Sequence, residues 1–272
     1  MPDAEALDPN LERRPDFIPW GLSLAAGGYL GAVLLSSVAV VTWQSLVGTG
    51  GSGGIGVLTV SFLAEWCCFV AAALSGAQGA GRGLRAAFGL TLKLWPDVPL
   101  GLAVGTLFQL VVLPLVYLPI APLVPHFAKR MSAPGRQLTS VAHHGPALVL
   151  LGVLIVVAAP TVEELFFRGL VLRSLEGHFG YPRAGARAEG RRGAGGDARR
   201  RRSGGAAGRW AAAVVSALLF GVAHVEPLQL LGLAAFGLAL ATMAQATGRL
   251  GPGIVAHAAF NATSFLALTH LH

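Results

Sequence analysis

Six polar side chains interrupt apolar segments in the second half of the sequence: Glu163, Glu164, Arg168, His224, His257 and Asn261. A charged side chain within hydrocarbon costs about 2.5–3.5 kcal/mol on insertion scales, so such residues usually pair or serve a function. A glutamate shielded from water suits a general base near neutral pH. Histidine and asparagine side chains donate the hydrogen bonds that a tetrahedral oxyanion needs. Together these groups indicate acyl-transfer hydrolysis, most simply of a peptide bond.

Their spacing predicts which side chains meet. Glu164 and Arg168 are four residues apart, so on a helix they share one face and can offset each other's charge. Glu163 projects about 100° away from Glu164 and needs a different partner. His257 and Asn261 are also four apart and point to the same side of their helix.

The depth of these side chains in the membrane can be compared from the sequence. Glu164, His224 and His257 lie 11, 14 and 8 residues from the cytoplasmic ends expected for their helices. At 1.5 Å rise per residue, the three depths agree within roughly 9 Å. We therefore expect the polar groups of three helices to share one level inside the bilayer.

The composition predicts the elements that position them. Of the 272 residues, 54% are hydrophobic and only 12% are charged, against about 25% charged in soluble domains. We expect an all-α fold, a polytopic membrane bundle of about seven transmembrane helices. A flexible polar tail (1–19), three N-terminal spans (20–145) and a catalytic membrane domain (146–268) divide the chain. The expected spans are 21–47, 55–74, 98–118, 146–175, 210–224, 228–246 and 252–268.

Two connections between the expected spans contain basic residues. Residues 84–95 fit an amphipathic helix lying in the interface. The Arg-rich insertion at about 180–209 is expected to be disordered because it lacks apolar content. Its stretch 183–209 holds nine arginines against two acidic residues, and this equals the +7 net charge of the whole chain. The charge is therefore local, and we expect no nucleic-acid partner. Placing it on the inner side of the membrane predicts a cytoplasmic N-terminus.

Three motifs follow in order on successive apolar segments, and together they resemble those of the CPBP family. This is the family of type II CAAX prenyl endopeptidases and their bacterial relatives, which include bacteriocin-processing and immunity proteins. The resemblance covers about residues 146–265. The motifs are Glu163-Glu164-x-x-x-Arg168, Phe220-x-x-x-His224 and His257-x-x-x-Asn261.

The resemblance implies an intramembrane endopeptidase and a role for each residue. Glu163 would activate a water molecule with help from His224. His257 and Asn261 would hold the oxyanion. Glu164 would support the site through Arg168 or a histidine. The expected partners are the lipid bilayer and a peptide or membrane-protein substrate, and no pattern indicates an oligomeric state.

The Gly/Ala/Arg-rich composition indicates a bacterium with a high-GC genome, hence a plasma-membrane location.

Other interpretations stay open at the level of sequence. Two histidines and a glutamate could bind zinc, but His-Glu-x-x-His is absent and asparagine is a poor zinc ligand, so no cofactor is favoured. A non-catalytic membrane scaffold or a bacteriocin-immunity protein could bind a peptide in the same cavity. A proton-coupled transporter would also bury acids and histidines, although no internal repeat is visible. Glu65, in the second span, is either a structural ion-pair partner or part of the site.

Overall fold

The computed structural model of the chain describes residues 21–47, 53–142, 145–179 and 196–270, and every regular element in these ranges is a helix. The expected tail at 1–19 lies outside the described residues. The α-helices are α1 (Gly21–Val47), α2 (Gly53–Gly79), α3 (Leu84–Phe88), α4 (Leu94–Leu107), α5 (Leu113–Tyr117), α6 (Phe127–Thr139), α7 (Gly145–Gly152), α8 (Ala159–Glu164), α9 (Leu172–Phe179), α10 (Gly196–Ala223), α11 (Leu230–Thr247) and α12 (Gly251–His270).

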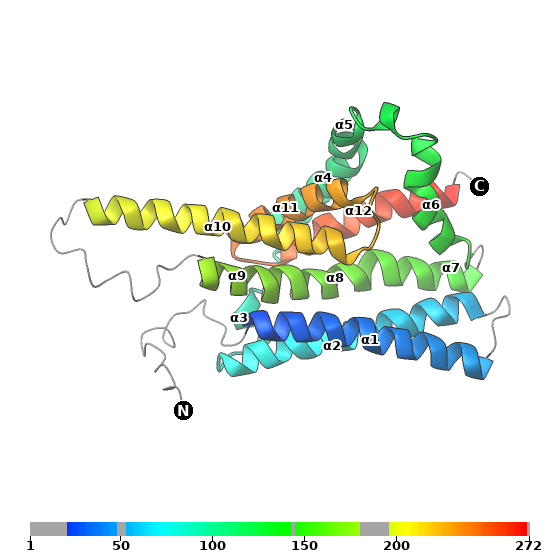
Figure 1. Ribbon diagram of the computed structural model, residues 1–272, viewed down its shortest axis with the longest axis horizontal. Coiled ribbons are helices and arrows are strands. Elements are labelled where there is room, and N and C mark those ends of the chain that lie inside the picture. Colours follow the sequence, from blue (N-terminus) through cyan, green and yellow to red (C-terminus); the bar gives the residue numbers. More distant parts are fainter. Residues whose placement is uncertain (1–20, 48–52, 143–144, 180–195, 271–272) are drawn as a thin grey trace.

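The long helices lie side by side in three layers (Figure 1). The pair α1–α2 forms one outer layer, and α7 to α9 form the middle one. The other side holds α4, α10, α11 and α12. Helix α6 crosses one end of the bundle and leads the chain from α5 back to α7.

The middle layer is one continuous helix of 35 residues, Gly145–Phe179. Two π-helical stretches, Val153–Ala158 and Leu165–Val171, interrupt its α-helical geometry on either side of α8. A π-helical turn shifts the direction of the side chains that follow it and is common at functional sites. Helix α8, which carries both glutamates, is therefore set between two such shifts.

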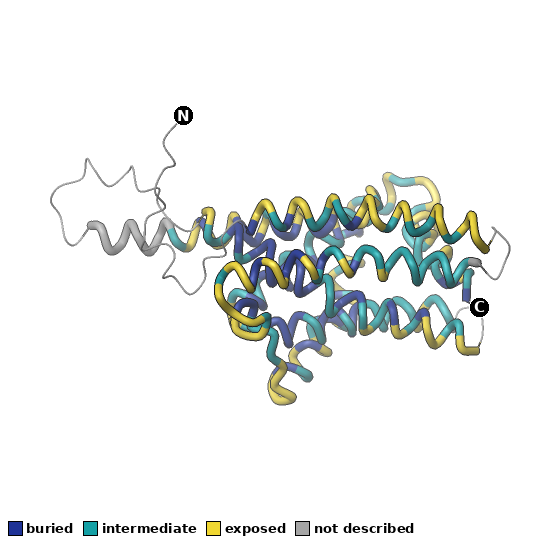
Figure 2. Tube along the Cα trace, turned by 90° about the horizontal axis from the view of Figure 1, so that it is seen from below, coloured by how far each residue is buried: buried dark blue, intermediate teal, exposed yellow. Residues whose placement is uncertain are grey.

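The outward faces of the bundle are apolar. Six helical segments of the described residues are long and apolar enough to cross a membrane: Gly21–Val47, Gly54–Gly79, Leu94–Tyr117, Gly145–Phe179, Gly205–Ala223 and Leu230–Thr247. Helix α12, of 20 residues, packs within the same bundle. Leu34 is 68% exposed and Leu115 is 61% exposed, and Figure 2 shows exposed residues following the outer sides of the helices. The chain is a multi-pass membrane protein, and the expected all-α membrane bundle is confirmed.

Two aromatic clusters pack inside the bundle, and the first of them joins its layers. Phe69 of α2 stacks on Phe166 with ring centroids 4.0 Å apart, and Phe167 contacts Phe220 of α10 at 5.4 Å. Aromatic pairs at such distances add about 0.5–1.5 kcal/mol beyond the burial of their area. The second cluster consists of Phe108, Phe236 and Phe260, and it joins α11 and α12 to the π-helical stretch that directly follows α4.

The structure corrects the prediction of an interfacial helix over residues 84–95. Helix α3 ends at Phe88 because Gly89 has a left-handed backbone conformation, with φ of 64°, which glycine adopts without strain. The chain then runs outside any helix to Lys93. The backbone carbonyls of Gly89 and Thr91 accept hydrogen bonds from Leu250 and Gly251, and these bonds replace those that a longer helix would have made.

The boundary of the Arg-rich insertion also differs from the prediction. Helix α10 begins at Gly196, so residues 196–209 are helical rather than disordered, while residues 180–195 lie outside the described residues. Alanine and arginine are strong helix formers. Extending a helix that the apolar span has already nucleated costs far less than starting a new one, so a low apolar content did not prevent helix formation there.

Candidate active site

Glu164 is at the centre of a buried charge network. Its side chain is 1% exposed, and its Oε1 accepts a hydrogen bond from Arg168 Nη1 at 2.8 Å. The same oxygen lies 3.1 Å from His257 Nδ1. The ion pair between Glu164 and Arg168 is the one that their spacing predicts, and the contact with His257 joins α8 to α12.

Arg168 is completely buried and is held on three sides. Besides Glu164, its Nη2 donates to the backbone carbonyl of Gly237 at 3.2 Å. Its guanidinium carbon lies 4.3 Å from the centre of the Phe220 ring, at the distance of a cation–π contact. Arg168 therefore connects the glutamate helix to α10 and α11, and it compensates the charge of Glu164 inside the bundle.

His257 lies between the two glutamates. While its Nδ1 faces Glu164, its Nε2 is 3.9 Å from Glu163 Oε2. The rings of Phe220 and Phe236 approach the imidazole edge-on, with centroids at 5.5 and 5.7 Å. These contacts leave the imidazole little freedom to rotate, so each ring nitrogen is directed at one carboxylate.

Glu163 differs from Glu164 in that its carboxylate accepts no hydrogen bond from the described residues. Its side chain is 17% exposed, and its buried Oε2 has no hydrogen-bond partner among the described residues. A buried polar atom without a partner costs about 1–3 kcal/mol. Glu65 of α2 lies within electrostatic range of Glu163. The site thus places an unpaired carboxylate oxygen beside a histidine nitrogen, which is an arrangement suited to binding a polar ligand.

Asn261 follows His257 by one helical turn. Its Nδ2 donates to the backbone carbonyl of Ile155 at 2.9 Å, in the π-helical stretch before α8. The amide nitrogen carries two hydrogens, so one remains available after this bond. Asn261 contacts the glutamate helix, and the described contacts include no direct bond from it to either glutamate.

His224 lies just after α10 ends, and its side chain is exposed. Its Nδ1 is 2.8 Å from the carbonyl of Phe220. Because a carbonyl only accepts, Nδ1 must be the protonated nitrogen, and Nε2 is the acceptor in the neutral ring. The Phe220 ring contacts both His224 and His257. Within the described part of the chain, His224 forms no hydrogen bond or ion pair with Glu163.

The structure therefore brings Glu163, Glu164, Arg168 and His257 into one cluster, with Asn261 and His224 at its border. The three sequence motifs include Phe220, but they do not include Phe236 or Gly253. A Cβ on Gly253 would lie 3.2 Å from Glu164 Oε2, so a glycine lets α12 approach the carboxylate closely. The sequence does contain a signal for this close approach, the segment Gly251-Pro252-Gly253. Its second glycine lies one helical turn before His257.

Comparison with known proteins identifies one related family. Residues 145–263 match the family described as type II CAAX prenyl endopeptidase Rce1-like. No curated protein and no solved structure matches the chain. The matched segment runs from the start of α7 into α12 and contains the whole cluster described above.

Proposed function

Residues 145–263 place this chain in the Rce1-like family of CAAX-type intramembrane proteases, and on that premise we propose that it hydrolyses a peptide bond through a water molecule activated by Glu163. The observation that carries the proposal is the imidazole of His257 between two carboxylates. One nitrogen is 3.1 Å from Glu164, and the other is 3.9 Å from the unpaired oxygen of Glu163. A water molecule bound there would touch a base and lie beside a hydrogen-bond donor.

The chemistry assigns one task to each group. Glu163 Oε2 takes a proton from the water, whose oxygen attacks the carbonyl carbon of the substrate. In the proposal His257 is the imidazolium, with a hydrogen on each ring nitrogen. The carbonyl oxygen becomes negative and accepts hydrogen bonds from His257 Nε2–H and from the second amide hydrogen of Asn261. The C–N bond then breaks, and the proton held by Glu163 passes to the leaving amine, with His224 Nε2 as a second proton acceptor near the site. The products are a carboxylic acid and an amine.

Glu164 and Arg168 position this machinery in the proposal. Glu164 accepts Nδ1–H of His257 and so fixes the orientation of the imidazole, in the way that a carboxylate orients the histidine of a serine protease. Arg168 compensates the charge of Glu164, and its bonds to α11 and α10 hold the carboxylate in place. Neither residue needs to touch the substrate.

The donor geometry also bears on metal dependence. Among the described residues, no group of three or more His, Cys, Asp or Glu side chains is arranged to hold a metal ion. The residues do not fit a zinc site, and we propose a mechanism without a metal. Treatment of the purified protein with a chelator is expected to leave cleavage unchanged, and a loss that added zinc restores would contradict this.

The substrate class follows from the location of the site. The cluster lies within apolar helices, so we propose a peptide or a membrane protein that enters from the bilayer. A cytoplasmic N-terminus in a bacterial plasma membrane remains our interpretation of the charge distribution. The Arg-rich segment and Arg82, Arg85 and Lys93 would then lie on the same side.

The proposal is tested by profiling peptide termini in cells. Membrane and secreted fractions are compared between cells that express the wild type, Glu163→Gln or the control Glu176→Gln, in which a carboxylate of α9 outside the cluster is changed. We expect new termini that are present with the wild type and the control and absent with Glu163→Gln. Equal termini in all three, together with an unchanged cellular phenotype, would favour the alternative of a non-catalytic scaffold or immunity protein.

A further inference from the structure

Asp97 and Arg249 form a second charge network, at the end of the bundle where α4 and α12 begin. Asp97 is completely buried in the first turn of α4. Its Oδ1 accepts a hydrogen bond from Arg249 Nη2, and its Oδ2 accepts one from Arg249 Nε at 3.3 Å and one from the backbone N–H of Lys93 at 2.8 Å. Arg249 lies in the short link between α11 and α12. One ion pair thus joins the starts of two helices that are far apart in the sequence.

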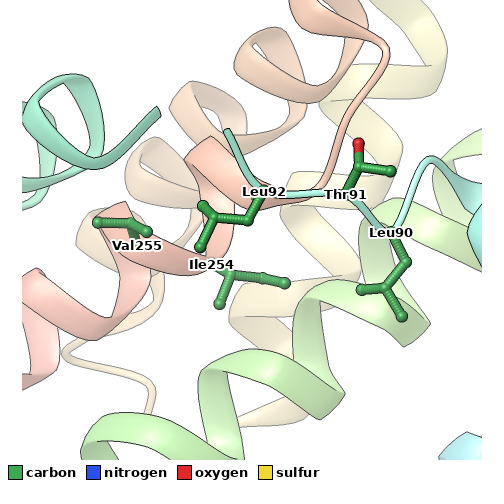
Figure 3. A pocket seen from close by; sticks show the side chains of 6 residues that line it. Leu90, Thr91, Leu92, Ile254 and Val255 are labelled. Atoms are coloured by element: carbon green, nitrogen blue, oxygen red, sulfur yellow. The ribbon is translucent and has the colours of Figure 1, made fainter. Parts of the chain in front are cut away.

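Backbone hydrogen bonds reinforce this junction. The N–H groups of Leu250 and Gly251 donate to the carbonyls of Gly89 and Thr91, at 2.9 and 3.2 Å. Figure 3 shows residues 90–92 passing next to the first turn of α12, where Ile254 and Val255 line a small apolar pocket with them. We call Asp97, Arg249 and these two backbone bonds the α12 clasp.

The clasp is also attached to the helix that carries the glutamates. Arg173 of α9 donates from Nη2 to the carbonyl of Gly248 at 3.2 Å and to that of Phe88 at 3.0 Å. Gly248 directly precedes Arg249, and Phe88 directly precedes Gly89, so each of the two chain segments of the clasp has one of these carbonyls beside it. The beginning of α12 is therefore fixed relative to α4 and to the middle layer at the same time.

Beyond the clasp, α12 runs along α4 at very close approach. A Cβ on Gly101 would lie 2.6 Å from Val255 Cβ, and a Cβ on Gly105 would lie 2.1 Å from the backbone oxygen of Ala256. Small residues at a four-residue spacing let two membrane helices pack backbone to backbone. His257 directly follows Ala256. A slip of α12 by one residue along α4 would move it by about 1.5 Å and turn it by about 100°, which would take His257 away from the glutamates.

We propose that Asp97 is a positioning residue that acts through Arg249. It sets the register of α12 on α4 and thereby holds the imidazole of His257 between Glu163 and Glu164. The effect on catalysis rests on the proposed function, whereas the effect on the placement of His257 does not. A shift of about 1 Å in a catalytic group can cost about 100-fold in rate, so a contact eight residues from His257 is close enough to matter.

The placement of His257 can be measured without a substrate. The protein is labelled with ¹⁵N-histidine, and the ring signals of His257 are assigned by their loss in His257→Gln. Asp97→Asn keeps the shape of the side chain and removes its charge. We expect folded Asp97→Asn to show shifted or broadened His257 ring signals, while the control Glu176→Gln gives those of the wild type. Glu176 pairs with Arg209 between α9 and α10 and lies outside the clasp.

Activity gives the second measurement, on the substrate that the terminal profiling identifies. We expect Asp97→Asn to lower kcat by about 100-fold with KM unchanged. If Asp97→Asn does not fold, Arg249→Lys, which keeps the charge but cannot bond both oxygens in the same way, is judged by the same signals. Wild-type His257 signals in a folded clasp variant would overturn the proposal. If profiling finds no proteolysis, the proposed function fails, and the His257 signals still decide the role of the clasp.

Discussion

The two charge networks of this protein differ in how completely their polar atoms are paired. In the clasp, both oxygens of Asp97 are bonded, to three donors in total. In the glutamate cluster, Glu163 Oε2 and Arg168 Nε have no hydrogen-bond partner among the described residues, and they are two of the four such buried side-chain atoms there. Since an unpaired buried polar atom costs free energy, the two networks serve different purposes.

In our proposal, this difference distinguishes a network that positions helices from a network that carries out the chemistry. The ion pair of the clasp stabilises one arrangement of helices, and both carboxylate oxygens of Asp97 are already bonded within the protein. A carboxylate with a free oxygen beside a histidine is less stable as it stands, and it is available to bind and deprotonate a ligand. The glutamate cluster contains both kinds of group, because Glu164 is bonded twice while Glu163 is not. Substitutions within the cluster should therefore separate activity from stability.

The largest effect is expected for Glu163→Gln. General-base catalysis contributes about 10²–10⁴-fold, so kcat should fall by about that factor. Stability should be unchanged or slightly higher, because a neutral amide costs less to bury than a carboxylate. Both quantities are measured on protein in detergent, by cleavage rate and by thermal unfolding. Retention of more than a tenth of the wild-type rate would mean that Glu163 is not the base and would remove the contrast between the two glutamates.

For Arg168→Met we expect a large loss of stability, whereas Glu163→Gln is expected to affect mainly kcat. Removing one partner of a buried ion pair leaves the other charge uncompensated and costs about 3–5 kcal/mol, so the free energy of unfolding should fall strongly. Thermal or denaturant unfolding in detergent measures it. The double variant Glu164→Gln with Arg168→Met carries no unpaired charge and should recover much of the loss. A double variant no more stable than Arg168→Met would show that the packing of Arg168 on Phe220, rather than its charge, holds the cluster together.

Local spacing predicted the parts of the cluster that lie on one helix. The ion pair of Glu164 with Arg168 follows from a separation of four residues. The long apolar runs predicted the membrane helices, because composition alone determines whether a segment suits lipid. The comparison of depths predicted that the polar groups of three helices lie at one level in the membrane. The contacts of His257 with both glutamates agree with this prediction for two of the helices, α8 and α12.

Contacts between distant segments could not be predicted in the same way. Nothing near Asp97 or Arg249 indicates that they pair, because the partner of each is determined by the packing of whole helices. The position of His257 between two carboxylates depends on Gly253 and on the π-helical stretches around α8, and a strict helical period does not describe such stretches. The helical start of α10 at Gly196 reflects extension from a packed span, which the local composition does not reveal.

A smaller effect on stability is expected for Gly105→Ala. The new Cβ would meet the backbone oxygen of Ala256 at 2.1 Å, so α4 and α12 must separate, at a cost of about 1–3 kcal/mol. The matched control is Gly27→Ala on α1, where a Cβ would meet nothing within 4 Å and where alanine should stabilise the helix slightly. Thermal unfolding of the two variants checks this. Equal stability would show that α12 is free to move on α4, and the clasp could not then control its register.

The smallest effect is expected for His224→Gln, which lowers kcat by roughly tenfold, less than the about 10²–10⁴-fold that the principal general base contributes. Glutamine can still donate to the carbonyl of Phe220, but it cannot take up a proton as the Nε2 of His224 can. Because His224 is exposed and has no bond to Glu163 among the described contacts, it should assist the base rather than replace it. The measurement is kcat beside that of Glu163→Gln. A loss of kcat as large as that of Glu163→Gln would mean that an exposed histidine carries out the essential proton transfer. The unpaired oxygen of Glu163 would then not identify the general base.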